Sequence, residues 1–482
     1  MRTLMSTRTA TAKPPAEPID PETKRIALAI VVGGLTVILD TTIVSVGLRD
    51  LASSLDTSID TIQWVSTAYL LAMFVSIPLA GWAQSRVGGK RLWLAALTVF
   101  IGASALCAVA WDAPSLIAFR ALQGLGGGIM MPLMSTLVMQ AAHGKNLGRI
   151  MAAVSLPAAL GPILGPVLGG LILNDLSWQW LFLVNVPLGA IGLLLAWRML
   201  PAGERGRRVS LDVVGLALVS PGVVAVIFGL SRVADAGGFG QAQVLVPVIG
   251  GLVLVAAFAV WGLRRGDEAL IDVRLFRHRA LTMSSLLLFL TGIALYGSML
   301  LLPLYWQEVR GQDALGAGLM LIPQGVGALA SRGLAGRLTD SVGGRWVAVG
   351  GFALMAIGTV PFAFSTEHTN EWWLGATLVV RGLGLGAVMI PLMTGAYVGL
   401  QRHEMPDASI VTRVGQQVGG SFGVAVLAVI LAAGTTGAAS TGDLAGAFDR
   451  AFWWATGFTV LAAVLSLLLP RPERSTAQAP AR

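Results

Sequence analysis

The sequence predicts an all-α integral membrane protein with fourteen transmembrane helices. The 482-residue chain is 55% hydrophobic and only 12% charged, with a mean hydropathy of +0.76, which excludes a soluble globular protein. Its apolar runs reach about 20 residues, the length that a helix needs to cross a bilayer core of about 30 Å. The runs lack the alternation of barrel strands, and lipid permits only helices or closed barrels.

The fourteen spans follow one another along the chain. A polar tail over residues 1–24 precedes them and has no apolar core of a signal peptide, so the first span is expected to direct insertion. Residues 471–482 form a second polar tail. The predicted spans are 26–48, 61–84, 92–111, 114–139, 147–173, 178–199, 211–231, 243–263, 280–305, 315–338, 345–364, 372–399, 408–433 and 450–470.

Basic residues predict the orientation of these spans. Of the 33 Lys and Arg residues, four fall in the predicted outer loops and four within spans, and the others fall in the tails and inner loops. We therefore expect a multi-pass protein of the plasma membrane with both termini in the cytoplasm. The net charge of +8 is spread over short loops, so orientation explains it and no nucleic-acid partner is expected.

Cysteine and histidine usage predicts no metal site. The single cysteine, Cys107, excludes an internal disulfide and any cysteine-built metal centre. The four histidines all fall in loops between apolar runs. The chain also has no nucleotide-binding P-loop, which argues against direct ATP drive.

An internal repeat divides the chain into two similar units. Residues 81–91 resemble residues 336–345, and each segment closes an outward-to-inward span. Arg120 and Arg381 each begin a glycine-rich stretch that runs on to Pro-Leu-Met. Parallel halves of this kind usually enclose a substrate path, although glycine-rich segments also serve close helix packing alone. The predicted units are a six-helix bundle over 25–200, two extra central spans over 201–270 and a second six-helix bundle over 271–470.

The two loop segments resemble a motif of the major facilitator superfamily, specifically of its fourteen-span drug:proton antiporter-2 branch. The motif reads Gly-x-x-x-Asp-Arg-x-Gly-Arg-Arg/Lys. Ser85 occupies the place of Asp in the first copy, and Ser341 that of Arg in the second. The matching residues are Gly81, Arg86, Gly88 and Lys90, and in the second copy Gly336, Asp340, Gly343 and Arg345.

The predicted spans carry further motifs similar to that branch, and the resemblance covers nearly the whole chain after residue 25. The segment 39–48 is similar to the first-helix motif Leu-Asp-x-Thr-Ile/Val-Val-Asn, with Ser45 in place of Asn. The fourth-helix motif Arg-x-x-Gln-Gly-x-Gly is matched by Arg120, Gln123, Gly124 and Gly126. The antiporter motif is matched by Gly161, Gly165, Pro166, Gly169 and Gly170, and the entry to helix six by Trp178, Trp180, Asn185 and Pro187.

Asp40 is the one acidic residue of 25 that falls well inside a predicted span. A charged side chain there costs about 3 kcal/mol or more, so an acid in this position is functional by default. Arg120 lies at a similar depth. We expect the two to pair, directly or through Gln123 or water, and to couple transport to protons. A static ion pair that locks the helices is the alternative.

The remaining candidate residues have weaker signals. The glycines and Pro166 of the antiporter motif are expected to control alternating access, or else to serve packing alone. The loop motif is expected to lock one conformation, or to anchor the inner face. Arg381 is placed like Arg120 but lacks a second buried acid. The predicted lining of a largely apolar substrate cavity is Tyr69, Tyr305, Gln324, Arg381 and Gln416.

The resemblance implies a secondary exporter of lipophilic drugs, antibiotics or related metabolites that works by alternating access. Its partners would be a small lipophilic substrate, protons and the lipid bilayer, and it would act as a monomer, without a cofactor and not as an enzyme. A symporter or importer of a specific small solute is the alternative within this class. A membrane enzyme or structural subunit would need a polar catalytic cluster, and none appears beyond Asp40 and Arg120.

Overall fold

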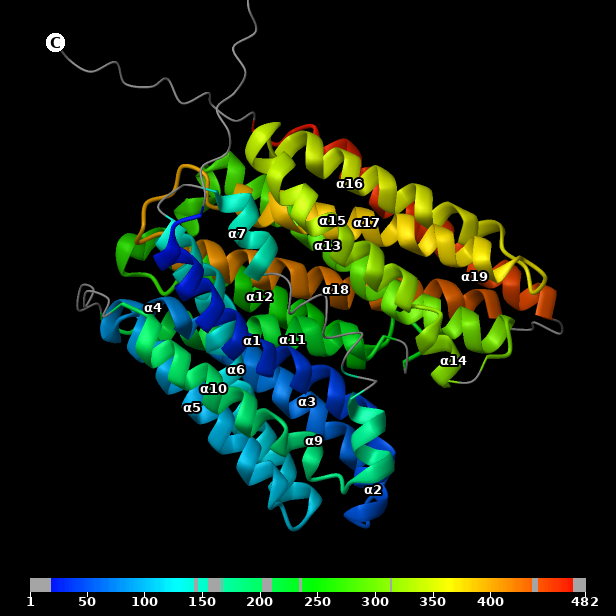
Figure 1. Cartoon of the computed structure of the whole chain (residues 1–482), viewed down its shortest axis with the longest axis horizontal. Coiled ribbons are helices and arrows are strands. Elements are labelled where there is room, and N and C mark those ends of the chain that lie inside the picture. Colours follow the sequence, from blue (N-terminus) through cyan, green and yellow to red (C-terminus); the bar gives the residue numbers. More distant parts are fainter. Residues whose placement is uncertain are drawn as a thin grey trace, which may run out of the picture.

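A computed structural model describes residues 19–142, 146–154, 165, 168–201, 210–233, 236–312, 314–435 and 441–470. Within these residues the chain forms helices and no strand, which confirms the all-α fold class. Figure 1 shows two groups of long helices with a further pair between them.

The first group contains the helices before residue 200. Its long members pack side by side, α3 and α5 against α6, and α1 against α10. The helices are α1 (Pro21–Val46), α2 (Leu48–Ser54), α3 (Ile59–Ser76), α4 (Leu79–Val87), α5 (Gly89–Ala108), α6 (Ala113–Ala142), α7 (Leu147–Val154), α9 (Trp180–Leu183) and α10 (Asn185–Met199).

The second group and the central pair follow. In the second group α17 packs against α15 and α16, and α13 packs against α18. The central pair, α11 (Val213–Ser231) and α12 (Ala242–Arg265), packs together, and α11 also contacts α3 and α18. Two short 3₁₀ turns, Gly266–Glu268 and Val273–Arg277, connect α12 to the second group. The second group contains α13 (Arg279–Leu304), a π-helical turn (Tyr305–Val309), α14 (Ala314–Leu319), α15 (Ile322–Ser341), α16 (Gly344–Thr359), a 3₁₀ turn (Val360–Phe364), α17 (Glu371–Gly395), α18 (Met405–Thr435) and α19 (Thr441–Ser466).

The number of spans is lower in the described residues than the predicted fourteen. Ten helices are long and apolar enough to cross a membrane, and the count rises to eleven if α3 and α4, bent by 56° at their break, are taken as one span. Pro78 stands at this bend, where its missing N–H falls at a helix start. Two further predicted spans are the helices α15 and α19, whose charged residues make them less apolar. In the predicted span 147–173, residues 155–164, 166 and 167 lie outside the described residues. The total of fourteen therefore stays a prediction.

Matching contacts in the two groups follow the internal repeat. Gly88 and Gly343 both adopt a left-handed conformation, with φ of 85° and 102°, which lets the chain turn sharply between two helices. The basic residue two positions later points back into its own group in both cases. Lys90 Nζ donates to Leu200 O at 2.7 Å, and Arg345 Nε donates to Leu469 O at 2.7 Å. Each cation thus binds a carbonyl that follows the last helix of its group.

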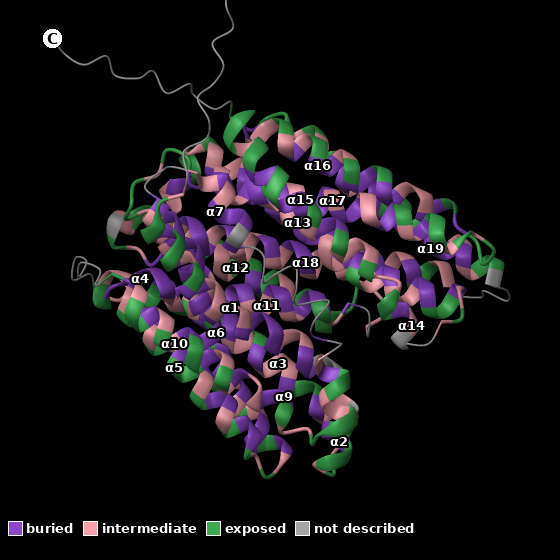
Figure 2. Ribbon diagram, in the orientation of Figure 1, coloured by how far each residue is buried: buried purple, intermediate pink, exposed green. Residues whose placement is uncertain are grey.

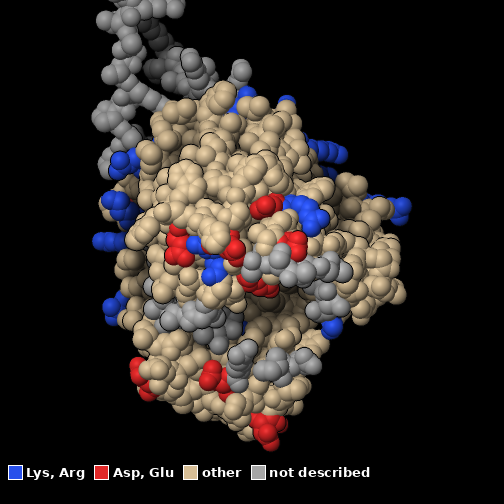
Figure 3. All heavy atoms as spheres, turned by 90° about the vertical axis from the view of Figure 1, so that its right-hand side faces the viewer, with Lys and Arg blue, Asp and Glu red and all other residues tan. Residues whose placement is uncertain are grey.

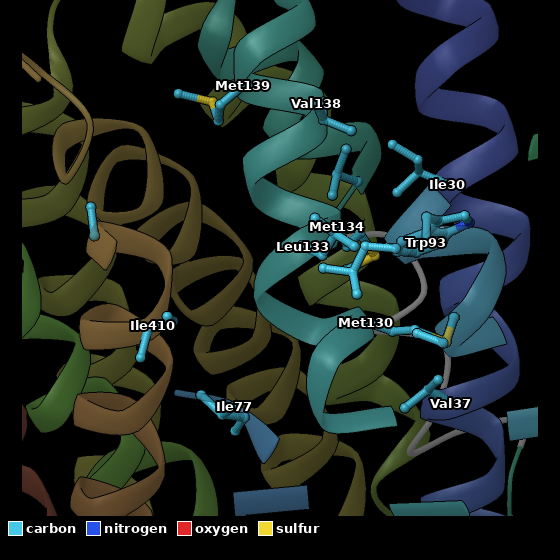
Figure 4. Packing of buried hydrophobic residues seen from close by; sticks show 14 of the residues in the cluster. Ile30, Val37, Ile77, Trp93, Met130, Leu133, Met134, Val138, Met139 and Ile410 are labelled. Carbon is cyan, nitrogen blue, oxygen red and sulfur yellow. The ribbon is translucent and has the colours of Figure 1, made fainter. Parts of the chain in front are cut away.

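Large apolar side chains cover the outside of the helices as well as the interior. Figure 2 shows exposed residues along the outward faces and buried ones between the helices. Exposed Trp197, Val246 and Ile357 form part of this outer surface, as expected for helices that face lipid. Figure 4 shows a buried cluster in which Ile30 and Val37 of α1, Trp93 of α5 and residues of α6 pack together.

The molecule has two different ends. The terminal face carries the two ends of the described chain and the turns at Gly88 and Gly343, and the two helix groups bind each other near it. Ser409 Oγ donates to Pro132 O at 2.7 Å, and Gln140 Nε2 donates to Arg402 O at 3.3 Å. Towards the opposite, distal face the groups diverge (Figure 1), and Figure 3 shows that this face is hollowed near its middle.

Candidate functional site

A buried ion pair lies in the middle of the first helix group. The guanidinium of Arg120, on α6, binds Asp40, on α1, with Nη1 2.6 Å from Oδ2. Their side chains are 1% and 0% exposed. The pair is direct, so neither Gln123 nor a water molecule has to bridge it. A buried pair of this kind is favourable only when further hydrogen bonds satisfy both charges.

Two amides supply the further bonds of the carboxylate. Gln123 Nε2 donates to Asp40 Oδ1 at 3.0 Å, and Asn185 Nδ2, at the start of α10, donates to the same oxygen at 2.8 Å. Gln123 Nε2 also donates to Ser104 Oγ of α5 at 2.5 Å. Asp40 therefore accepts hydrogen bonds from three side chains, one of which is charged.

Arg120 has further partners on α3. Its Nε donates to Val65 O at 3.2 Å, and its guanidinium carbon lies 4.1 Å from the centre of the Tyr69 ring. A cation over an aromatic face is stabilised by the ring quadrupole, and more so away from water. Five helices, α1, α3, α5, α6 and α10, thus contribute to one polar network.

The glycines after Arg120 explain how α6 comes close enough to its neighbours. A Cβ added to Gly124 would lie 2.2 Å from Tyr69 O, and one added to Gly126 would lie 2.8 Å from Ala96 O. The backbones of α3 and α5 therefore touch α6 directly, as small residues permit in membrane helices. This close packing positions Arg120 between them.

Asn185 and Ser104 were not among the predicted site residues. Asn185 belongs to the motif Asn-Val-Pro, and the position of this motif at a helix entry is the only sequence signal for a role of Asn185. Ser104 stands in an apolar run without any signal. Both side chains are fully buried beside Asp40.

Arg381 makes a second, acid-free network in the other helix group. Its Nε donates to Thr359 Oγ1 at 3.1 Å and its Nη2 to Ala294 O at 2.9 Å, and its Nη1 bonds to Gln324 Oε1. No carboxylate pairs with it in the described part of the chain.

Arg381 does not correspond to Arg120 in three dimensions. Gly382 and Gly384 meet the backbones of α15 and α16 as Gly124 and Gly126 meet those of α3 and α5. This register places Arg381 at the position of Gln123, which lies three residues after Arg120. Thr359 then matches Ser104, and the counterpart of Arg120 is the buried Leu378. The prediction that Arg381 is placed like Arg120 is therefore wrong, since the spacing from the arginine to the glycines differs between the copies.

Of the five residues predicted to line a cavity, only Gln324 and Arg381 bond to each other in the described part of the chain. Tyr69 lies under Arg120, and Gln324 binds Arg381. Tyr305 is fully buried among Trp306, Phe362, Phe448 and Phe452. Gln416 contacts Met389, with Nε2 3.7 Å from Sδ.

None of those five residues lines either of two pockets at the terminal face. One has a volume of about 970 Å³ and lies between the two helix groups and the connections of the central pair. The other, about 180 Å³, lies beside Asp340 and Arg345. Residues of the larger pocket include Asp20, Gln84, Lys90, Asp212, Asp272 and Asp407.

The second copy of the loop motif joins the two helix groups. Asp340 Oδ1 accepts from Gly148 N at 2.9 Å, and Oδ2 accepts from Arg149 N at 3.3 Å, at the start of α7. A carboxylate at a helix N-terminus satisfies otherwise unpaired N–H groups. In the first copy Ser85 bonds to Trp82 O, one turn earlier in its own helix, and Arg86 lies over the Trp82 ring.

The antiporter motif is described only in part, because Gly161 and Pro166 lie outside the described residues. A Cβ on Gly165 would lie 2.1 Å from Thr42 Oγ1, so this glycine touches α1 two residues beyond Asp40. Gly169 is buried, and Gly170 is exposed with open space around its Cβ position. Gly165 therefore makes a close contact with a neighbouring helix, whereas Gly170 makes none.

Comparison with known proteins agrees with this architecture. The family model of the Major Facilitator Superfamily matches residues 30–424. The multidrug resistance protein B homolog of Mycobacterium tuberculosis is 37% identical over 409 residues, which are 84% of this chain and 76% of that protein. The lincomycin resistance protein LmrB of Listeria monocytogenes is 27% identical over 409 residues, covering 85% of this chain and 86% of the relative. The multidrug export protein EmrB of Haemophilus influenzae is 29% identical over 406 residues, covering 83% and 79%.

Solved structures show the same fold. The proton:xylose symporter XylE has a TM-score of 0.67 at 15% identity, covering 94% of this chain and 97% of that one. The human organic anion transporter MFSD10 has a TM-score of 0.63 at 17% identity, covering 93% and 100%.

Two helix groups joined at one face, with a buried ion pair inside one of them, define a multi-pass membrane transporter. The chain belongs to the major facilitator superfamily, which confirms the family expected from its motifs.

Proposed function

We propose that this protein exports a small lipophilic compound in exchange for protons by alternating access. The observation that carries the proposal is the Asp40–Arg120 ion pair, which is fully buried and makes four further hydrogen bonds, to Val65, Gln123 and Asn185. An intramembrane acid paired in this way marks a proton or substrate pathway by default. The names of its relatives, multidrug resistance, lincomycin resistance and multidrug export, support a lipophilic drug or antibiotic as the substrate.

The charge balance of the pair supports proton coupling. In the described conformation Asp40 is bonded as a carboxylate, and the two helix groups diverge towards the distal face. A proton that enters from the distal side would neutralise Asp40 and weaken its attraction to Arg120. The freed cation, held by Val65 O and the Tyr69 ring, would favour the opposite conformation, in which the proton leaves on the terminal side.

The proposal includes the setting in which the exchange occurs. The terminal face lies in the cytoplasm of a cell whose plasma membrane carries the proton gradient, as the distribution of Lys and Arg indicates. The protein acts there as a monomer, and the gradient replaces any cofactor or enzymatic step. Gln123 and Asn185 hold the carboxylate in place.

Removal of the acid tests the proposal. Asp40→Asn keeps the size and most hydrogen bonds of the side chain but cannot bind the coupling proton. In inside-out vesicles we expect this variant to lose accumulation of ethidium driven by a pH gradient by at least about 10-fold, and to keep exchange of ethidium across vesicles at equal pH.

Asp112→Asn is the matched control, since Asp112 precedes α6 at the distal face, where it binds Ser115. Because Asn serves equally well at a helix start, this variant should transport like the wild type. If Asp40→Asn still accumulated ethidium in response to the gradient, the ion pair would have only a static role in holding the helices together. Movement of ethidium with the protons, in the same direction, would instead indicate a symporter.

A further inference from the structure

We propose that the side-chain amide of Asn185 rotates when Asp40 is protonated. Asn185 is a positioning residue for proton coupling, and its role rests on the proton exchange proposed above. The amide donates to the carboxylate when Asp40 is charged, and accepts from the carboxylic acid when Asp40 is protonated.

The unused oxygen of Asn185 is the first observation. Its Nδ2 donates to Asp40 Oδ1 at 2.8 Å, whereas its Oδ1 is buried and has no hydrogen-bond partner in the described part of the protein. The residue is 0% exposed. Buried polar atoms are nearly always satisfied, so an exception calls for an explanation.

The other amide beside Asp40 cannot turn in this way. Gln123 Oε1 accepts from Arg120 Nη1 at 2.5 Å, and its Nε2 donates to both Asp40 and Ser104. A half-turn of Gln123 would break three bonds and bring its oxygen against the carboxylate. Asn185 has only one strong bond to exchange, so it is the amide that is free to reorient.

The geometry also selects the oxygen that takes the proton. Oδ2 of Asp40 faces the guanidinium of Arg120, which has donors only. Oδ1 faces two amides, of which Asn185 turns. The other titratable groups that face Asp40 are Tyr69 of α3 and Cys107 of α5, and α10 presents no charged group there.

Protonation therefore requires one proton and one rotation. The proton binds Oδ1, and the carboxylate loses its charge. A half-turn of the Asn185 amide then brings its oxygen to the position held by Nδ2, within reach of the new O–H. Ser104 Oγ, now 3.4 Å from Nδ2, would donate its hydroxyl to the same oxygen. The turned Nδ2 then occupies the place that Oδ1 holds in the charged state, and its bonds to Asp40 and Ser104 are replaced by the two that the oxygen accepts.

Infrared difference spectroscopy of the purified protein tests this directly. Acidification should produce the C=O band of a protonated carboxylic acid, and this band should be absent in Asp40→Asn. Together with it, the amide C=O band of Asn185 should shift to lower frequency, because its oxygen gains a hydrogen bond only in the protonated state. The amide shift should be absent in Asn185→Leu and in the smaller Asn185→Ser.

Asn174→Leu is the matched control, since Asn174 also donates to a carboxylate, Asp175, but at the exposed distal surface. It should retain both bands. Asn185→Leu should also raise the pH midpoint of the carboxylic band by about half to one unit, since a bond to a charged group is stronger than one to a neutral group. A carboxylic band without the amide shift would overturn the inference alone. Absence of the carboxylic band in the wild type would overturn the proton exchange itself.

Discussion

At the scale of single residues, the stability of the first helix group depends on two opposite charges that have no access to water. Arg120 is 1% exposed and Asp40 is 0% exposed, and each is the main partner of the other. An unpaired charge left in such a place costs far more than the pair contributes. Loss of one charge therefore differs in its consequences from loss of both.

We expect Arg120→Leu to lower the free energy of unfolding by about 3–5 kcal/mol, because Asp40 is then buried without its cation. The double variant Asp40→Asn with Arg120→Leu should recover at least half of this loss, since no charge remains. Thermal unfolding of the detergent-solubilised variants measures both. Equal losses in the single and double variants would mean that packing against Tyr69, and not charge, dominates.

The antiporter motif contains glycines of two different kinds. Gly165→Ala would bring a methyl group to 2.1 Å from Thr42 Oγ1, and the backbone carbon of Thr42 is only 3.0 Å away. We expect a loss of about 1–3 kcal/mol in stability with slowed transport, because α1 has to move away. Gly170→Ala, in open space, should stay within about 0.5 kcal/mol of the wild type. Vesicle transport and thermal unfolding measure both variants. Equal losses of stability and transport in Gly165→Ala and Gly170→Ala would contradict this prediction.

At the scale of helices, α15 and α7 form one of the contacts that link the two groups at the terminal face. The backbones of Gly336 and Gly148 touch, and a Cβ on Gly336 would lie 2.8 Å from Gly148 O. Asp340, one turn further along α15, binds the first N–H groups of α7. Close approach and carboxylate capping therefore act at the same junction.

We expect Gly336→Ala to push the groups apart at the terminal face. The readout is a disulfide between Gln140→Cys and Arg402→Cys, whose parent residues are joined by a 3.3 Å hydrogen bond across the same face. Its yield should fall severalfold, because separated thiols cannot meet. Gly333→Ala, on the same helix but in open space, is the control and should leave the yield unchanged. An unchanged yield in Gly336→Ala would show that this junction does not hold the face closed.

At the scale of the whole molecule, the two faces should lie on opposite sides of the membrane. His368 is 87% exposed at the distal face, and Arg402 is exposed at the terminal face. The protein's own Cys107 is fully buried and gives little background. In intact cells we expect a membrane-impermeant maleimide to label His368→Cys and not Arg402→Cys. In inside-out vesicles the pattern should reverse. Labelling of Arg402→Cys in intact cells would show that the terminal face lies outside, opposite to the proposed topology.

The amino-acid sequence carries much of this architecture because membrane physics constrains it strongly. Apolar runs of fixed length have to be helices, and the glycine-rich loop copies repeat the turns found at Gly88 and Gly343. The lone acid, Asp40, and the arginine at similar depth also stand out in the sequence, since charges are rare in such runs. Less apolar helices such as α15 and α19 are harder to place, because their charged residues lower the mean hydropathy of the run.

The sequence by itself determined the helical membrane fold, because burial cost and periodicity leave few alternatives. It also predicted two related halves and a contact between Asp40 and Arg120, either direct or bridged. Only the tertiary structure decided which side chains complete the site. Asn185 and Ser104 reach Asp40 from helices far away in the chain, and Arg381 matches Gln123 through helix register, which sequence spacing misjudged. Such contacts depend on how closely the backbones approach, and a linear pattern of residues does not contain that distance.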